Sequence, residues 1–69
     1  MKTFKIWVSV NDYEYTTTVT LYGEKIAVGD PFEMDNEWRY PVFVDDHMIA
    51  FDEYIVSIEE DGKEIYCGV

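Results

Sequence analysis

Hydrophobic and polar residues alternate along most of this chain with a period of two, which is the spacing of side chains on one face of a β-strand. The alternation starts at Phe4 and continues to Val10. A second segment, from about Tyr13 to Tyr22, is rich in Thr, Val and Tyr, which favour strands. No long helical pattern interrupts this alternation, so the sequence predicts an all-β fold.

Two tight turns are expected in the first half of the chain. Asn11-Asp12 suits a two-residue turn because Asn and Asp tolerate positive φ, and this turn places Val8 opposite Tyr15. Gly23-Glu24 suits a type II′ turn, which has Gly at its first central position. The first three strands are therefore predicted to form a meander with one shared apolar face.

The second half of the chain is predicted to contain shorter strands. Residues 32–44 read as one bent strand or two short ones, with Pro41 at an edge, a bulge or a bend because it has no N–H group. Asp45-Asp46 is the next expected turn. Beyond it, residues 48–51 form either a short strand or part of a single helical turn across 46–54.

The last hairpin has the strongest local signal. Asp61-Gly62 favours a type I′ turn, which places Glu60 opposite Lys63. In the same register Cys67 faces Val56 on the apolar side, so it is expected to be a small buried residue.

These elements predict one domain over residues 1–69 with five or six short antiparallel strands. Because no helix covers the sheet, it must close on itself or fold over. The expected architecture is a small barrel of the SH3-like or OB-like type, or a compact sandwich, built from consecutive hairpins.

The chain is strongly acidic, with 15 acidic and 5 basic residues and a formal net charge of −10. Such a surface repels nucleic acid and anionic membranes and attracts a basic protein. The alternative is that the charge only keeps a small domain soluble. Cys67 has no second cysteine to pair with and the N-terminus does not resemble a signal peptide, which together favour a reducing, cytoplasmic location.

Catalytic and cofactor chemistry is not expected. Cys67 and His47 form the one conceivable nucleophile–base pair, but the expected burial of Cys67 argues against it. Asp45-Asp46-His47 contains three potential metal ligands, yet adjacent strand residues point in opposite directions. The sequence has no glycine-rich phosphate loop, so we predict a non-enzymatic protein without metal or cofactor.

A row of acids gives the leading hypothesis for function. Glu33, Asp35 and Glu37 recur every second residue, and on one strand they would share a face at intervals of roughly 6.8 Å. Trp38 follows and is predicted to contact a partner beside the row. The row is then a mimic of nucleic-acid charge that blocks a basic nucleic-acid-binding protein. In size and charge, though not in any motif, the chain resembles phage inhibitors of restriction or CRISPR enzymes.

Four further residues are predicted at contact surfaces. Asp45 and Asp46 add acidic groups at a turn, while Trp7 and Tyr22 lie on the polar side of the first two strands. An alternative function is therefore assembly, in a homodimer or a larger complex, through Trp7, Tyr22 and the threonines around them. Capture of a small molecule or nucleotide in a barrel is a third possibility.

Overall fold

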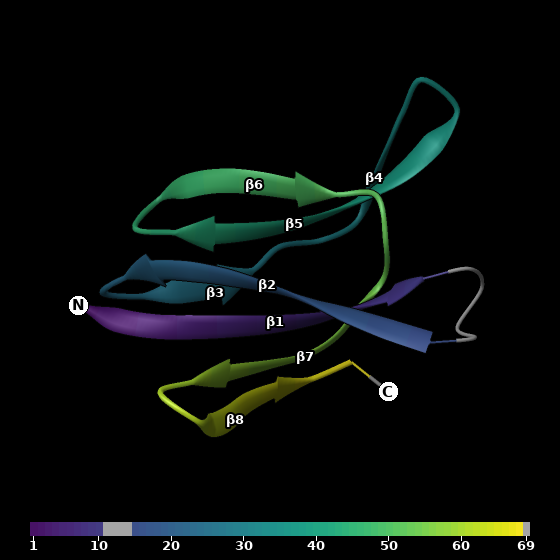
Figure 1. The fold of residues 1–69 in the computed structure, drawn as a ribbon. Coiled ribbons are helices and arrows are strands. Elements are labelled where there is room, and N and C mark those ends of the chain that lie inside the picture. Colours follow the sequence, from purple (N-terminus) through teal and green to yellow (C-terminus); the bar gives the residue numbers. More distant parts are fainter. Residues whose placement is uncertain (11–14, 69) are drawn as a thin grey trace.

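The computed structural model describes residues 1–10 and 15–68 and consists of β-strands and turns (Figure 1). It contains eight strands, more than the five or six expected from the sequence. The strands are β1 (Lys2–Val10), β2 (Tyr15–Gly23), β3 (Ile26–Val28), β4 (Phe32–Met34), β5 (Glu37–Val44), β6 (His47–Phe51), β7 (Ile55–Glu60) and β8 (Lys63–Cys67). All of their pairings are antiparallel, so the predicted all-β class is confirmed.

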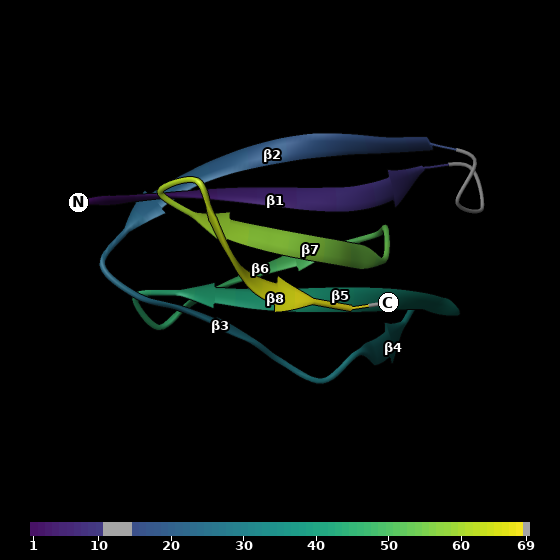
Figure 2. The same ribbon diagram turned by 90° about the horizontal axis from the view of Figure 1, so that it is seen from below.

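The strands form two sheets. The first has the order β2-β1-β7-β8, and the second has the order β3-β5-β4 with β6 paired to β5. The two sheets lie as separate layers when the molecule is viewed from below (Figure 2). Within the described residues neither sheet closes on itself, because the first ends at β2 and β8.

Both sheets contribute side chains to one hydrophobic core. Alternation along β1 directs every second side chain inward, and the same holds for the central strand β5. The buried hydrophobic residues are Phe4, Ile6, Val8, Ile55 and Ile58 from the first sheet, and Val42 and Val44 from the second. The core therefore depends on contacts between the sheets as well as within them.

The pairing of β1 with β2 differs from the expected register by two residues. Val8 lies opposite Thr17, and Val10 rather than Val8 lies opposite Tyr15. Because the shift is an even number, the apolar residues of both strands stay on the expected face. The predicted turn at Asn11-Asp12 lies outside the described residues.

The predicted meander of the first three strands is wrong, because β3 leaves β2 and pairs with β5 in the other sheet. Gly23 does not have the positive φ that a type II′ turn requires. Instead, the backbone N–H groups of Glu24 and Lys25 both donate to the Asp45 carboxylate, at 3.0 Å each to Oδ1. The N–H of Asp45 donates to the Lys25 carbonyl at 3.1 Å. The crossing of the chain from the first sheet to the second, between β2 and β3, is therefore held by a residue about twenty positions away.

Substitution of Gly23 is expected to disturb this crossing. A Cβ atom at Gly23 would lie 2.6 Å from Val44 Cγ1 and 2.7 Å from Asp45 Oδ2, so both side chains would have to move. We expect Gly23→Ala to lower the free energy of unfolding by about 1–3 kcal/mol, as overpacking does. Thr18→Ala is the control, because Thr18 lies at an exposed position of the same strand and exposed substitutions usually change stability little. Equal urea midpoints for the two variants would contradict the close approach at Gly23.

Two-residue turns connect β4 to β5 and β5 to β6 in the second sheet. Asp45 and Asp46 have φ of 49° and 68°, which confirms the expected turn, and β6 after it is a strand rather than a helical turn. Asp35 and Asn36, with φ of 56° and 65°, form a turn that the sequence analysis did not identify. This turn divides residues 32–44 into β4 and β5, the two-strand alternative.

Pro41 lies where β5 changes its neighbour. On one side of β5, β3 pairs with residues 42–44 and β4 pairs with residues 37–39, so Pro41 falls between them. Its carbonyl accepts a hydrogen bond from Gly29 N–H at 3.1 Å. The position of the proline in a gap of the sheet agrees with its lack of an N–H group.

The last hairpin has the expected turn and an unexpected bulge. Asp61 and Gly62 have φ of 49° and 87°, and Glu60 lies opposite Lys63. The register then shifts between Ile58 and Glu59, so Cys67 lies opposite Ser57 rather than Val56. This shift places Cys67 in an exposed position, and the prediction of a buried cysteine is wrong.

Candidate protein-binding surface

The hairpin of β4 and the first half of β5 projects from the body of the molecule (Figure 1). Asp and Asn tolerate the left-handed conformation, which allows the chain to reverse at Asp35 and Asn36. The hairpin pairs Glu33 with Trp38 and Met34 with Glu37. Partners directly opposite one another share a face, so each face of the hairpin carries one acid and one large hydrophobic residue.

Both hydrophobic residues of this hairpin are exposed. The exposed fraction is 56% for Trp38 and 47% for Met34. Large exposed side chains next to polar ones are common at protein interfaces, and Trp is prominent among residues that dominate binding energy. The hairpin therefore offers a hydrophobic contact on each side with a carboxylate beside it.

The predicted straight row of Glu33, Asp35 and Glu37 is wrong. Glu33 lies on the Trp38 face of the hairpin, whereas Glu37 lies on the Met34 face. Asp35 belongs to the turn and has a φ of 56°, so it does not continue a strand. The three residues share one projecting hairpin but do not form evenly spaced charges along one face.

Arg39 connects this hairpin to the link between β6 and β7. One of its guanidinium nitrogens lies 3.0 Å from Glu37 Oε2 and 3.0 Å from Asp52 Oδ1, and the side chain is only 16% exposed. The hydrogen bond to Glu37 and the nearby charge of Asp52 raise the pKa of Arg39 above its ordinary value. The guanidinium, which like that of any arginine is charged at physiological pH, links the two segments through Glu37 and Asp52.

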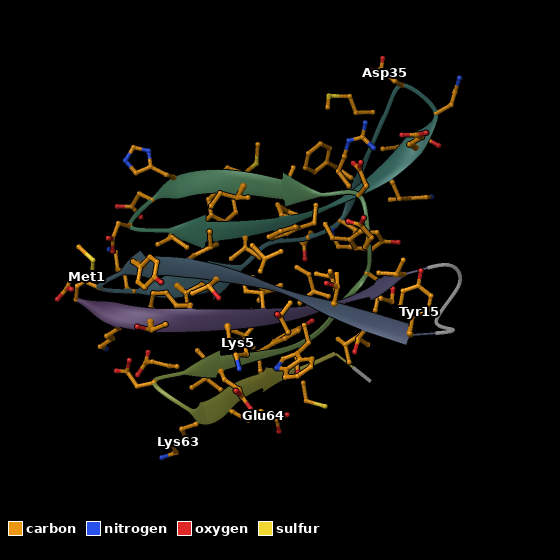
Figure 3. The ribbon with its side chains drawn as sticks, in the orientation of Figure 1. Met1, Lys5, Tyr15, Asp35, Lys63 and Glu64 are labelled. Atoms are coloured by element: carbon orange, nitrogen blue, oxygen red, sulfur yellow. The ribbon has the colours of Figure 1, made fainter. Side chains whose placement is uncertain are left out.

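Other acids at this end form no ion pair. Among the described residues, no basic group lies within ion-pair distance of Glu33, Asp35 or Glu53, although the charge of Asp35 also acts on Arg39 from a longer distance. We call the β4–β5 hairpin together with Asp52 and Glu53 the acidic end. Figure 3 shows Asp35 at the tip of this hairpin, far from Met1 and Lys63.

The opposite end of the molecule is also acidic, and three of its carboxylates lie beside a cation. The N-terminal amine lies 3.3 Å from Glu24, Lys2 Nζ lies 3.6 Å from Glu60, and Lys25 Nζ lies 3.7 Å from Asp46. Exposed pairs like these contribute little to stability, but they reduce the local negative potential. These pairs partly neutralise Glu24, Asp46 and Glu60, whereas Glu33 and Glu53 have no cation of the described residues within ion-pair distance.

Asp45 and Asp46 lie at this opposite end, away from Glu33 and Trp38. The Asp45 carboxylate is engaged with the backbone of Glu24 and Lys25, so it has a structural role at the crossing between sheets. The structure thus separates the predicted acidic residues into two groups, at the two ends of β5.

Trp7 and Tyr22 lie on the outer face of the first sheet. Trp7 is partly buried, and Lys5 Nζ lies 5.6 Å from its ring centroid, within cation–π range. Tyr22 is 62% exposed and lies opposite Thr3. The two aromatic residues share a face but lie four positions apart along the β1–β2 pair, and Trp38 belongs to the other sheet, so the three do not form one compact patch.

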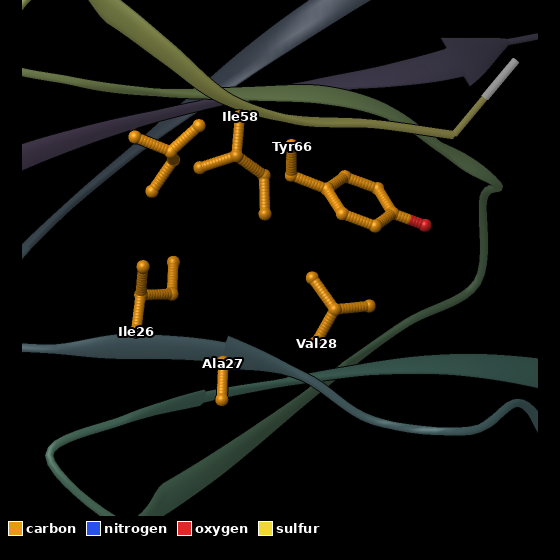
Figure 4. A pocket seen from close by; sticks show the side chains of 6 residues that line it. Ile26, Ala27, Val28, Ile58 and Tyr66 are labelled. Carbon is orange, nitrogen blue, oxygen red and sulfur yellow. The ribbon is translucent and has the colours of Figure 1, made fainter.

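Other candidate sites have little polar character. A cavity of about 300 Å³ lies between β3 and the β7–β8 hairpin (Figure 4). Its lining residues are Ile26, Ala27, Val28, Ile58, Ile65 and Tyr66. None of them is a cation, so this cavity offers no charge complementary to a phosphate group.

Titratable groups that were considered for catalysis or metal binding lie apart. His47 is at the start of β6 and Cys67 at the end of β8, in different sheets. No group of three or more His, Cys, Asp or Glu side chains within the described residues is arranged to hold a metal ion. The same residues include no helix with the length and apolar character to cross a membrane.

Comparison with models of known protein families, with curated proteins and with solved structures finds no match for this chain.

Proposed function

We propose that this protein is a non-enzymatic acidic binding module that attaches to a basic protein through its acidic end. The observation that carries the proposal is the exposure of Trp38 on a projecting hairpin whose Glu33 and Asp35 carboxylates form no ion pair with a described residue. The Trp38 side chain would supply buried hydrophobic area in a complex. The carboxylates around it would orient and accelerate the approach of a positively charged partner.

The partner that fits this chemistry best is a nucleic-acid-binding protein, which presents basic groups in a groove. A net charge of −10 on 69 residues would compete with nucleic acid for such a groove. Competition would arise from the density of charge on the projecting hairpin rather than from a regular row. The module would then be an inhibitor of the kind that phages use against host defence enzymes.

The proposal treats the two sheets as the layers of a compact sandwich, with the hairpin extending from one of them. A shared core drawn from both sheets supports this arrangement over a closed barrel. We also propose a cytoplasmic location, where a single cysteine is expected to remain reduced.

Replacement of Trp38 by alanine tests the proposal. The binding probes are purified nucleic-acid-binding enzymes with basic grooves, including restriction endonucleases and CRISPR nucleases, measured by surface plasmon resonance at increasing salt. We expect at least one to bind, with affinity that falls as salt rises and that is lost when competing nucleic acid is added. Trp38→Ala should weaken this binding about 30-fold, the effect of losing about 2 kcal/mol at a dominant contact.

Tyr22→Ala is the matched control, because Tyr22 is an equally exposed aromatic residue outside the acidic end. It should leave the affinity unchanged. If Tyr22→Ala rather than Trp38→Ala abolishes binding, the assembly function through Trp7 and Tyr22 replaces the proposal. Failure of every probe to bind would contradict the assigned class of partner.

A further inference from the structure

Strand β2 is a long sheet edge without charged residues. Within the described residues its only hydrogen-bonded neighbour is β1, and it is the outermost strand of the first sheet (Figure 2). Its nine residues, YTTTVTLYG, contain no charge in a chain of which 29% is charged. They also contain no proline. A long edge of this kind presents backbone N–H and C=O groups that can pair with another strand.

The other edges of the two sheets are protected in ways that β2 is not. The edge strand β8 has five residues, two of which are the charged Lys63 and Glu64. Strand β6 also has five residues, and acids flank it at 45–46 and 52–53. Strands β3 and β4 have three residues each. Short strands and nearby charges both discourage pairing between molecules, so β2 is the edge best suited to accept a strand.

The charge of the molecule is distributed so that the segment containing β1 and β2 carries no net negative charge. Residues 1–23 contain two basic and two acidic residues. Residues 24–69 contain three basic and thirteen acidic residues and therefore carry the entire net charge of −10. A second acidic molecule can thus approach the β2 edge with less repulsion than it would meet at the acidic end.

We propose that β2 pairs with β2 of a second copy of this chain, in an antiparallel arrangement that continues the first sheet through a twofold axis. A twofold pairing uses the same strand on both copies and closes after two molecules, so it does not propagate into fibres. A second copy fits better than a basic partner. Strand β2 has no carboxylate with which it could bind the basic groups of such a partner.

Side-chain alternation limits the register of this pairing. Val19 points toward the core side of the sheet, whereas Thr18 and Thr20 point to the outer side. For both apolar faces to stay on one side of the joined sheet, the axis must lie between the two copies of one residue, so that this residue faces its own copy across the pair. Threonines of the two copies then face one another on the outer side, where cross-strand Thr pairs are favourable.

This dimer is independent of the proposed function, because β2 and the acidic end have no residue in common. The two associations also respond to salt in opposite directions. Salt should strengthen the dimer by screening two chains of charge −10, whereas it should weaken binding to a basic protein.

Sedimentation equilibrium of the purified chain, at low and at high salt, tests the proposal. We expect a mass that rises from 8.2 kDa toward twice that value as protein concentration increases, with a larger dimer fraction at high salt. A monomer at millimolar concentration in high salt would overturn the proposal, as would a dimer that salt dissociates.

Lysine substitutions identify the edge. Thr18→Lys with Thr20→Lys places two charges on the exposed outer face of β2 and should reduce the dimer association constant at least tenfold. Met48→Lys with Ala50→Lys, on the exposed face of the edge strand β6, makes the same change in net charge. This control pair should leave the dimer association constant unchanged. The opposite ranking of the two pairs would show that another edge forms the dimer and would overturn the proposal.

Hydrogen exchange gives a test that needs no substitution. In a monomer, the β2 amides that point away from β1 exchange quickly because water can reach them. In the wild-type protein we expect these amides to become protected as concentration rises, while those of β6 do not change. Protection of β2 that does not depend on concentration would count against the dimer.

Discussion

Phe4→Ala is expected to leave a large fraction of the molecules unfolded at room temperature. Phe4 is completely buried and lies in the core that joins the two sheets. Truncation of a buried phenylalanine removes about 3–5 kcal/mol of stability. A domain of 69 residues has a total stability of about 3–10 kcal/mol, so the loss is of the same order as the whole.

Urea unfolding followed by circular dichroism measures this effect. Tyr22→Ala is a suitable control, because Tyr22 is also aromatic and belongs to the same pair of strands but is 62% exposed. Exposed substitutions usually change stability by less than about 0.5 kcal/mol. If the two variants unfold at the same urea concentration, Phe4 does not occupy the core as described.

The strands and several turns could be predicted from the sequence because they depend on neighbouring residues. Asp61-Gly62 and Asp45-Asp46 adopt positive φ for local reasons, so their turns were identified correctly. The register of β1 and β2 was not predicted correctly. Alternation fixes which face a residue occupies, but it does not distinguish registers that differ by two residues. The bulge between Ile58 and Glu59 also has no clear local signal. Because of it, Cys67 lies opposite Ser57 in an exposed position and not opposite Val56.

The crossing at Gly23 shows why pairing between strands was harder to predict. Locally, Gly23-Glu24 resembles a hairpin turn. The outcome is decided by the Asp45 carboxylate, which accepts hydrogen bonds from the backbone on the far side of the crossing. An interaction over about twenty residues cannot be inferred from the pattern of either segment, so the expected meander was replaced by two sheets.

The candidate site was predicted in part. Trp38 and Glu33 are exposed neighbours on one hairpin, as the leading hypothesis requires. The regular row failed because Asp35-Asn36 is itself a turn signal within the alternating acids. Met34 was not identified, although it lies among the acids in the sequence. Asp52 was not identified either, because its place beside Arg39 depends on the pairing of β5 with β6.

The central claim is that the position of the negative charge, and not only its amount, determines binding. Neutralising the three acids of the acidic end that form no ion pair, with Glu33→Gln, Asp35→Asn and Glu53→Gln, reduces the negative field around Trp38. Asn retains the turn conformation at position 35. At about 0.5 kcal/mol for each exposed charge contact, affinity for a basic nucleic-acid-binding enzyme should fall roughly tenfold.

The most direct test compares this triple variant with a second one of the same net charge. Asp46→Asn, Glu59→Gln and Glu64→Gln remove three charges outside the acidic end, and Glu59 and Glu64 lie opposite one another as like charges. Affinities of both variants are measured for the same enzyme at the same salt concentration. The account predicts a roughly tenfold loss for the first variant and less than a twofold change for the second. Equal losses for the two would contradict it, because binding would then depend on total charge alone.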